Sequence, residues 1–253
     1  MPNRWFPYRQ PRRNPAIRLF CFSHAGAGAA LYRQWDEHLP VSIEVCAVQL
    51  PGRETRFREP LCRDMTRLLD SLEPEILPLL NRPFALFGYS AGALMVYALA
   101  LRLSERTGLA PLHLFTAACA APQFVDRLYL NSTLPDLEFE QRIRALNGFV
   151  SELAANAELF ALTRLIVRAD LQIIESHKVI NDTRVSCPIS VFAGSHDWQT
   201  PTELLRGWAA VTRGSFQLDT LDGDHFFIRN NLASITRKVS QRLTGRVVEM
   251  VDD

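Results

Sequence analysis

The sequence predicts a single α/β domain in which a mainly parallel central sheet carries helices on both faces. Three observations lead to this prediction. Apolar, strand-like runs alternate with helical patterning through the first half of the chain, and the same alternation returns near the end. A chain of 253 residues is also long enough to bury one large core. We therefore expect one domain, 1–253, with a helical lid subdomain inserted at about 123–178, where the sequence shows no strand pattern.

Composition excludes several classes of function. The 28 basic and 27 acidic residues give a formal net charge of +1, so no overall field favours binding to nucleic acid or to an anionic membrane. No apolar run approaches the roughly 20 residues that a membrane-spanning helix needs, and the arginine-rich start of the chain does not resemble a signal peptide. We expect a soluble cytoplasmic protein and take a monomer as the default oligomeric state.

Cysteine usage agrees with a reducing compartment. Four of the five cysteines lie in or beside apolar, strand-like runs, and none forms a Cys-x-x-Cys pair. These four are expected to be small buried side chains: Cys21, Cys46, Cys119 and Cys187.

The first predicted strand, 17–22, leads into a glycine-rich loop, 23–29. The strand follows a segment, 1–15, that we expect to be an extended arm or a short edge strand held by its aromatic residues. A glycine-rich loop before a helix, here about 31–38, can bind phosphate, but neither Gly-x-Gly-x-x-Gly nor Gly-Lys-Ser/Thr is present. The loop is better suited to present a backbone N–H to an oxyanion, and an ordinary tight turn is the alternative.

The second predicted strand, 43–50, ends in Pro51-Gly52-Arg53-Glu54-Thr55-Arg56. Charged residues on such a loop usually form a solvated, salt-bridged turn. Arg53 and Arg56 also follow the carboxyl end of a strand, where open α/β sheets bind ligands, so a substrate-side role is the other interpretation. An irregular helix with two prolines is expected at 66–80.

The third predicted strand, 84–89, turns directly into a helix that begins at Ala91, and Ser90 lies at the junction. Such a turn strains the serine backbone and leaves no room for side chains nearby, which explains Gly88 and Gly92 in the motif Gly-x-Ser-x-Gly. The Ser90 hydroxyl would then stand at the carboxyl end of a parallel strand, beside the positive end of a helix. Ser90 is therefore the candidate nucleophile.

A fourth strand, 112–119, precedes the helical insertion. Residues 133–136 resemble a helix N-terminus, and a second helix is expected at about 157–176. The first helix carries apolar residues at one-face spacing, namely Phe139, Ile143, Leu146 and Val150. Helices at this point cannot join the sheet, so we expect them to cover its carboxyl edge, where an apolar cap would suit an acyl chain. Packing on the side of the core is the alternative.

The final part of the chain returns to alternating elements. Strands are predicted at 188–194 and 216–221, and helices at about 202–211 and 231–243. The tail from Gly245 onward is expected to fray.

A serine hydroxyl needs a base, and the base needs an orienting group. After Ser90, the chain offers Asp197 behind the fifth predicted strand and His225 behind the sixth. Nucleophile, acid and histidine follow one another in this order in the α/β-hydrolase fold, which the predicted architecture resembles. Asp222 and Asp224 are alternative acids, although their Asp-Gly-Asp context is typical of a turn.

Two backbone N–H groups are candidates for an oxyanion hole. One belongs to Ala91, directly after the nucleophile, and the other belongs to the early glycine-rich loop, most simply to Ala25. His24 lies in that loop and is interpreted as a loop-stabilising residue, with contact to substrate as the alternative.

Taken together, five motifs resemble the stand-alone type II thioesterases of polyketide and nonribosomal peptide synthesis. They lie between about Ile17 and Leu243 in the family's order: Phe22-Ser-His-Ala-Gly-Ala-Gly28, Leu50-Pro-Gly-Arg-Glu54, Gly88-Tyr-Ser-Ala-Gly92, Gly194-Ser-His-Asp197 and Gly223-Asp-His-Phe-Phe227. The helical insertion adds Arg168-Ala-Asp170. Tyr89 and Ala91 depart from the His and Met that are more usual beside the family serine, so any acyl preference is left open.

The resemblance implies an editing enzyme that hydrolyses acyl groups from the phosphopantetheine arm of acyl or peptidyl carrier proteins. It implies Ser90 as nucleophile, Asp197 as acid, His225 as base, and Ala25 and Ala91 as oxyanion donors. No metal or bound cofactor is implied, because the pantetheine belongs to the carrier. Tyr89 and His24 would lie on the substrate side, with Arg53 and Arg56 as carrier contacts. Rival interpretations are another esterase or an acyltransferase of the same fold, and an acyl-carrier-binding module with little turnover.

Overall fold

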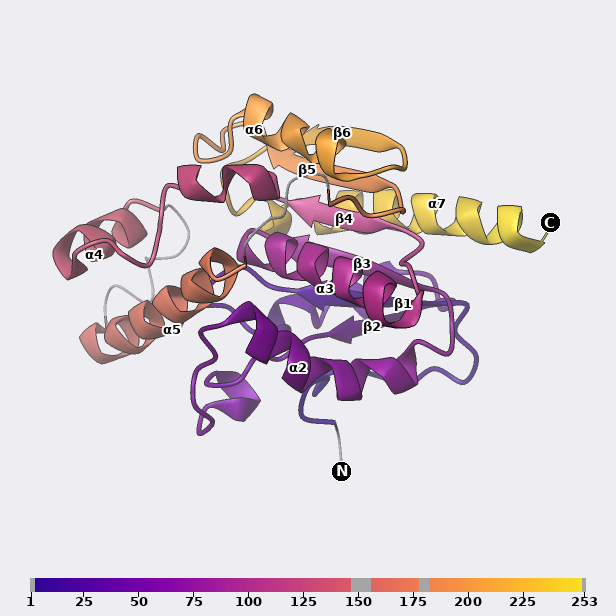
Figure 1. Cartoon of the computed structure of the whole chain (residues 1–253), viewed down its shortest axis with the longest axis horizontal. Helices are drawn as coiled ribbons and strands as arrows, with labels where there is room; N and C mark the ends of the chain where they lie inside the picture. Colours follow the sequence, from indigo (N-terminus) through magenta and orange to yellow (C-terminus); the bar gives the residue numbers. More distant parts are fainter. Residues whose placement is uncertain (1–2, 147–155, 178–182, 252–253) are drawn as a thin grey trace.

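The computed structural model describes residues 3–146, 156–177 and 183–251, and its centre is a six-stranded parallel sheet (Figure 1). The strand order is β2-β1-β3-β4-β5-β6, and every neighbouring pair runs parallel. The strands are β1 Ile17–Phe22, β2 Ile43–Ala47, β3 Phe84–Tyr89, β4 Leu114–Ala117, β5 Ile189–Gly194 and β6 Phe216–Leu221. This arrangement confirms the predicted mainly parallel α/β sheet.

Helices cover both faces of the sheet (Figure 1). On one face α2 contacts α3, and on the other α1 contacts α7. The seven α-helices of the described residues are α1 Trp35–His38, α2 Met65–Ile76, α3 Ala91–Thr107, α4 Asp136–Arg144, α5 Ala157–Glu175, α6 Thr202–Arg206 and α7 Leu232–Val251. Because both faces are covered, all residues of β1 to β4 are buried, as the continuous apolar runs of the sequence predicted.

Three predicted helices are each observed as an α-helix and a 3₁₀ turn. The predicted helix 66–80 ends its α-helical part at Ile76 and continues as a 3₁₀ turn, because Pro78 cannot continue the α-helical hydrogen bonding. The predicted helix 202–211 changes to a 3₁₀ turn at Gly207. The predicted helix 31–38 is also split, into a 3₁₀ turn and α1.

Other element ends also differ from the predictions in detail. α4 begins at Asp136, within the predicted N-terminus 133–136, but its N-cap is Pro135 and no side chain caps it; the hydroxyl of Thr133 donates to Asn131 Oδ1 instead. The tail beyond Gly245 was expected to fray, yet α7 continues to Val251. Strand β2 ends at Ala47, before the predicted residue 50, and β4 spans Leu114–Ala117 in place of the predicted 112–119.

The N-terminal segment packs as an irregular arm. Its aromatic residues Trp5 and Phe6 are buried in the core, as expected, and from residue 3 to residue 15 the structure forms turns and no strand. The guanidinium of Arg56 lies 4.0 Å from the centre of the Trp5 ring and holds the arm against the loop after β2. The four cysteines predicted to be buried are free and buried.

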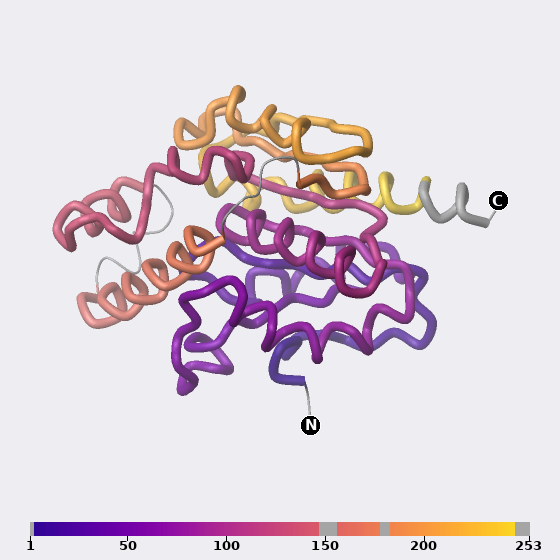
Figure 2. The backbone as a smooth tube through the Cα atoms, in the orientation of Figure 1, coloured from indigo at the N-terminus to yellow at the C-terminus, as the bar shows by residue number. Residues whose placement is uncertain are grey.

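The insertion between β4 and β5 is helical in its described part. It contains a 3₁₀ segment, Pro122–Arg127, followed by α4 and α5. Figures 1 and 2 show α4 and α5 beyond the carboxyl end of β4, with the end of α5 next to the start of α3. Phe139, Ile143 and Leu146 are buried, as their spacing predicted, while Val150 lies outside the described residues.

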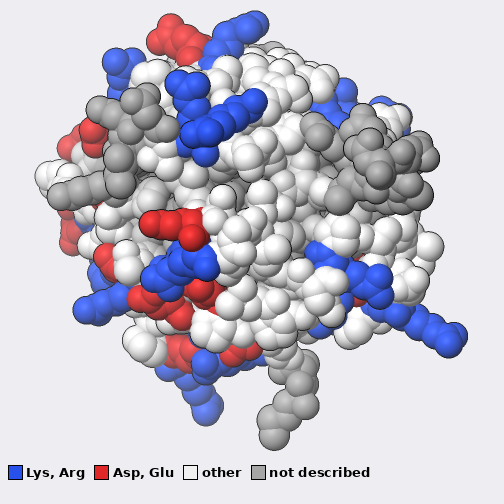
Figure 3. All heavy atoms as spheres, turned by 45° about the vertical axis from the view of Figure 1, so that its right-hand side comes forward, with Lys and Arg blue, Asp and Glu red and all other residues white. Residues whose placement is uncertain are grey.

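Surface charge follows the balanced composition. On the face that Figure 3 shows, basic and acidic side chains are interspersed over an otherwise uncharged surface. In the described part of the chain no helix is long and apolar enough to cross a membrane.

Candidate active site

Ser90 occupies the sharp turn between β3 and α3, and its backbone has φ 52° and ψ −120°. The turn closes because its two glycines allow close contact. A Cβ atom on Gly88 would lie 2.4 Å from the carbonyl oxygen of Gly92, and one on Gly92 would lie 2.4 Å from that of Phe22. The conformation of Ser90 is uncommon for a residue with a side chain. The predicted strained elbow is therefore present.

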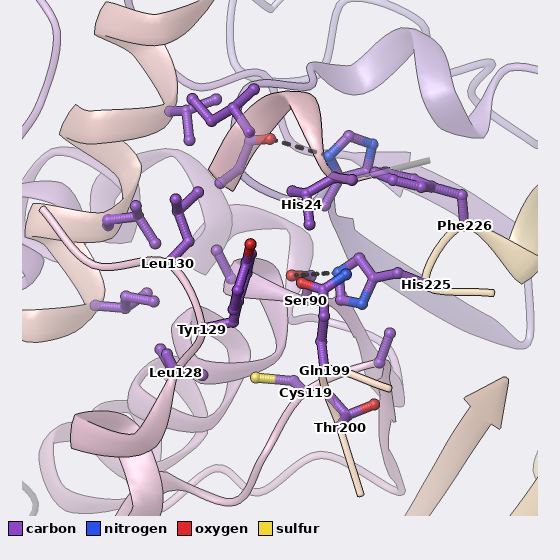
Figure 4. Close-up of a pocket in the computed structure, with 18 residues that line it drawn as sticks. His24, Ser90, Cys119, Leu128, Tyr129, Leu130, Gln199, Thr200, His225 and Phe226 are labelled. Carbon is purple, nitrogen blue, oxygen red and sulfur yellow. Dashed lines mark hydrogen bonds between the residues drawn. The ribbon is translucent and has the colours of Figure 1, made fainter. Parts of the chain in front are cut away.

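The imidazole of His225 lies between Ser90 and Asp197. Figure 4 shows its contact with Ser90. Nε2 of His225 is 3.2 Å from the Ser90 hydroxyl oxygen, and Nδ1 is 2.9 Å from Asp197 Oδ2. A carboxylate can only accept a hydrogen bond, so Nδ1 carries the proton and Nε2 is left as the acceptor for the serine hydroxyl. This is the tautomer that a general base requires.

The structure places Asp197, and neither of its two alternatives, against His225. Asp197 is buried, and its carboxylate also accepts hydrogen bonds from the Thr200 hydroxyl at 2.7 Å and the Gln199 N–H at 3.1 Å. Asp222 is exposed and accepts from the hydroxyl of Ser195. Asp224 caps its own turn by accepting from the Phe226 N–H.

The electrostatics of this site keep Asp197 ionised. Burial alone would raise the pKa of its carboxyl, but the hydrogen bonds and charge supplied by His225, with the bond from Thr200, lower that pKa below its usual value. An ionised Asp197 can stabilise the positive charge that His225 gains when it accepts a proton.

The two expected oxyanion residues, Ala25 and Ala91, line the same pocket as Ser90. Ala91 is the first residue of α3, so its N–H has no acceptor within the helix. Ala25 lies in a turn closed by the Ala27 N–H, which donates to the His24 carbonyl at 3.1 Å. Gly26 has φ +86°, the conformation that a type II turn requires at its third residue.

His24 has a structural contact that agrees with its interpretation as a loop-stabilising residue. Its ring Nδ1 is 3.0 Å from the Ala25 carbonyl oxygen, so Nδ1 is the donor. The ring is buried and packs edge-on against Tyr89 and Phe226. Burial is the largest of the effects that lower the pKa of His24 to about 4, so the ring is neutral at pH 7.

His24→Gln should weaken the acid sensitivity of folding. The folded-state pKa of His24 is about 4 and the unfolded value is near 6.5, so protonation favours the unfolded chain as the pH falls from 6.5 toward 4. The wild type should lose about 2 kcal/mol of unfolding free energy from this residue between pH 6.5 and pH 5. Urea unfolding at both pH values measures the difference.

His196→Gln is the matched control for that measurement, because the side chain of His196 is 73% exposed. It should keep the pH dependence of the wild type. An equally steep loss of stability in His24→Gln would show that His24 is not the group that titrates.

The pocket beside Ser90 has one polar end and a long apolar wall (Figure 4). Leu128, Tyr129 and Leu130 lie opposite His225 in the close-up. Further apolar side chains come from the helical insertion: Ile143 within α4, Leu146 just after it, and Val167, Leu171 and Ile174 from α5. Such a lining suits a hydrocarbon chain whose reactive end meets Ser90.

Cys119 also lines this pocket. Burial raises the pKa of its thiol to about 12, so the group is protonated at neutral pH and is a poor nucleophile. Ser90 is therefore the better nucleophile in this pocket.

Arg53 and Arg56 are both buried, which does not fit their expected role as contacts to a carrier protein. Arg53 forms two hydrogen bonds to Asp170 of α5, at 2.5 and 2.6 Å. Arg56 pairs with Glu59 and donates to the Gln49 carbonyl. Arg53 therefore binds the helical insertion, whereas Arg56 contacts its own loop and the N-terminal arm.

Sequence reasoning missed the role of Tyr89. Its side chain was expected on the substrate side, but it is fully buried and does not line the pocket. The phenol hydroxyl donates to the backbone carbonyl of His225 at 2.5 Å, which links the strand before the nucleophile to the loop of the histidine. The motif Gly-x-Ser-x-Gly carries no signal for this contact, since its partner lies 136 residues away.

No group of three or more His, Cys, Asp or Glu side chains is arranged to hold a metal ion within residues 3–146, 156–177 and 183–251. The arrangement at Ser90 provides the groups of a covalent acyl transfer: a hydroxyl, an imidazole, an ionised carboxylate and backbone N–H groups.

Comparison with known proteins points to one family. A family model described as a thioesterase domain matches residues 17–243. The gramicidin S biosynthesis protein GrsT of Aneurinibacillus migulanus is 35% identical over 226 residues, which cover 89% of this chain and 88% of GrsT. LgrE of Brevibacillus parabrevis, named linear gramicidin dehydrogenase, is 35% identical over 250 residues, which cover 98% of this chain and 95% of LgrE.

A solved structure shows the same relationship. The type II thioesterase BorB from the borrelidin biosynthetic cluster superposes with a TM-score of 0.77 at 28% identity, and the match covers 93% of this chain and 94% of BorB.

Proposed function

Because this chain belongs to the thioesterase family and is a serine thioester hydrolase, we propose that it is a stand-alone type II editing thioesterase of polyketide or nonribosomal peptide synthesis. Its substrates are acyl groups on the phosphopantetheine arm of carrier proteins. The observation that carries the proposal is the position of His225, between Ser90 and the buried Asp197, at the polar end of an apolar pocket. The glycine-rich loop lacks the Gly-x-Gly-x-x-Gly spacing of a dinucleotide site, so the dehydrogenase name of LgrE is not carried over to this chain.

The first half of the reaction forms an acyl-enzyme. The Ser90 oxygen attacks the thioester carbonyl while His225 Nε2 takes the hydroxyl proton. The N–H groups of Ala25 and Ala91 hold the oxyanion of the tetrahedral intermediate. The C–S bond then breaks, and protonated His225 returns its proton to the departing pantetheine sulfur.

The second half uses water. The oxygen of a water molecule attacks the carbonyl carbon of the Ser90 ester while His225 takes a proton from that water. The same oxyanion donors hold the new tetrahedral intermediate. The C–O bond to Ser90 breaks, Ser90 recovers its proton from His225, and the free acid leaves. Asp197 keeps the imidazole in one tautomer through both halves.

The helical insertion acts as a lid in this proposal. Ile143, Val167 and Leu171 from the insertion face the same pocket as Ser90, so an acyl chain would lie between the lid and the sheet edge. Exclusion of bulk water from this space protects the acyl-enzyme until the chain is correctly placed. The carrier protein docks beside the lid so that its arm can reach Ser90, and the enzyme acts as a monomer.

The test of the proposal measures the rate at which the enzyme releases free acid from an acyl-loaded carrier protein. For comparison, the same acyl group is supplied as a thioester of free pantetheine and as an oxygen ester. We expect kcat/KM to be highest for the carrier substrate, since binding energy from the carrier adds to that of the acyl chain.

Three results would contradict the proposal. Equal rates on the oxygen ester would indicate a general esterase. Transfer of the acyl group to an added alcohol or amine in place of water would indicate an acyltransferase. Binding of the acyl-carrier without release of acid would indicate a carrier-binding module.

A further inference from the structure

A buried ion pair joins the lid helix α5 to the loop after β2. Asp170 of α5 and Arg53 of the loop after β2 have side chains that are 1% and 3% exposed. Their guanidinium and carboxylate groups meet through two parallel hydrogen bonds. Such a two-bond geometry orients both groups as well as attracting them.

The same carboxylate holds the glycine-rich loop 23–29, which carries Ala25 and is called the oxyanion loop below. Asp170 Oδ2 accepts the backbone N–H of Gly26 at 2.8 Å, and Arg53 Nη1 donates to the Ala27 carbonyl at 3.3 Å. The peptide group between Ala25 and Gly26 is therefore held at both ends: its N–H by Asp170, and its carbonyl by the His24 ring at 3.0 Å.

The orientation of the neighbouring peptide follows from these contacts. The carbonyl of His24 accepts the Ala27 N–H inside the turn. A trans peptide directs its N–H opposite to its carbonyl, so the N–H of Ala25 points away from the turn interior. Ala25 itself lines the pocket that contains Ser90.

We propose that Asp170, with Arg53, is a positioning residue that fixes the oxyanion loop to lid helix α5 and thereby aims the Ala25 N–H at the reacting carbonyl. The inference rests on the proposed function. It couples the position of α5 to that of the loop, because a shift of α5 would move the carboxylate that holds Gly26. Neither Asp170 nor Arg53 lines the pocket, so both act through the loop.

Asp170→Asn tests this role. The amide cannot neutralise Arg53, and its NH₂ group faces a guanidinium donor, so the bidentate contact is lost. The amide oxygen can still accept one hydrogen bond, so the hold on the loop is weakened. We expect kcat to fall about tenfold to a hundredfold, as for a small displacement or partial loss of an oxyanion donor, while KM changes less than about threefold. The measurements are steady-state hydrolysis of an acyl thioester and the rate at which a fluorophosphonate labels Ser90.

Glu140→Gln is the matched control. It also converts a lid carboxylate to an amide and breaks an ion pair, to Arg164 of α5 at 2.6 Å, but it has no contact with the oxyanion loop. It should keep kcat and the labelling rate of the wild type.

A double variant separates positioning from stability. Asp170→Asn leaves a buried cation unpaired, which destabilises a protein strongly and can prevent folding. Arg53→Met combined with Asp170→Leu removes both charges and should melt closer to the wild type, yet it should show the same loss of kcat. If this folded double variant hydrolyses and labels within threefold of the wild type, the proposal is wrong.

The same measurements distinguish failure of the proposed thioesterase function from failure of the positioning role of Asp170. If the wild type is labelled at Ser90 but releases no acid from thioesters, the thioesterase proposal falls, and slower labelling of the Asp170 variants would still support the positioning role. If the fluorophosphonate does not label wild-type Ser90, both proposals are wrong.

Discussion

Ser90→Ala is expected to lower kcat by about a millionfold, because the acyl-enzyme can no longer form. His225 and Asp197 act on the same proton transfer, so their retention cannot compensate for the missing hydroxyl. The fold should remain, since the change removes one oxygen atom, whose contact is a 3.2 Å hydrogen bond to His225. The measurement is single-turnover release of acid from the acyl-carrier, together with urea unfolding of both proteins.

Ser195→Ala is the control for this experiment. Ser195 is an exposed serine that follows β5 at the same edge of the sheet, and its hydroxyl contacts Asp222. It should hydrolyse thioesters at the wild-type rate. If Ser90→Ala retained that rate with an intact fold, the nucleophile would have to be another residue.

Asp197→Asn should lower kcat by about ten thousandfold while leaving the packing of the site nearly unchanged. An asparagine can turn its NH₂ group toward His225 Nδ1, which then accepts, so the ring proton moves to Nε2. The imidazole would then present a proton to Ser90 at the atom that has to remove one. The loss should appear in kcat more than in KM, since the acyl pocket is retained.

The pH dependence of stability provides a second measurement on the same variant. The folded-state pKa of Asp197 is lowered, so ionisation of this group stabilises the wild type above its unfolded pKa and the contribution is lost as the pH falls through the folded value. Asp197→Asn should lack this contribution.

Asp222→Asn is the control for the acid, because Asp222 is exposed and contacts Ser195. It should have little effect on kcat. A silent Asp197→Asn together with a damaging Asp222→Asn would contradict the assignment of the acid.

Local sequence was sufficient to predict those features of the fold and of the site that depend on residues close together in the chain. The elbow at Ser90 could be predicted because an apolar strand, two glycines and a helix-forming run are contiguous. The order of Ser90, Asp197 and His225 could be predicted because each follows a strand whose carboxyl end lies at one edge of a parallel sheet. Helix boundaries at Pro78 and Gly207 were missed, because a helical pattern of apolar residues continues through the change to a 3₁₀ turn.

The sequence by itself therefore determined the parallel α/β architecture, the helical insertion, and Ser90 and His225 as residues of the candidate site. It left three candidate acids, and only the structure placed Asp197 against His225. Only the tertiary structure decided that Arg53 pairs with Asp170, 117 residues away, and that Tyr89 bonds to His225, 136 residues away. The physical reason is one of range. Periodicity and turn chemistry act over a few residues, whereas the partner of a buried polar group depends on how distant segments pack around the sheet.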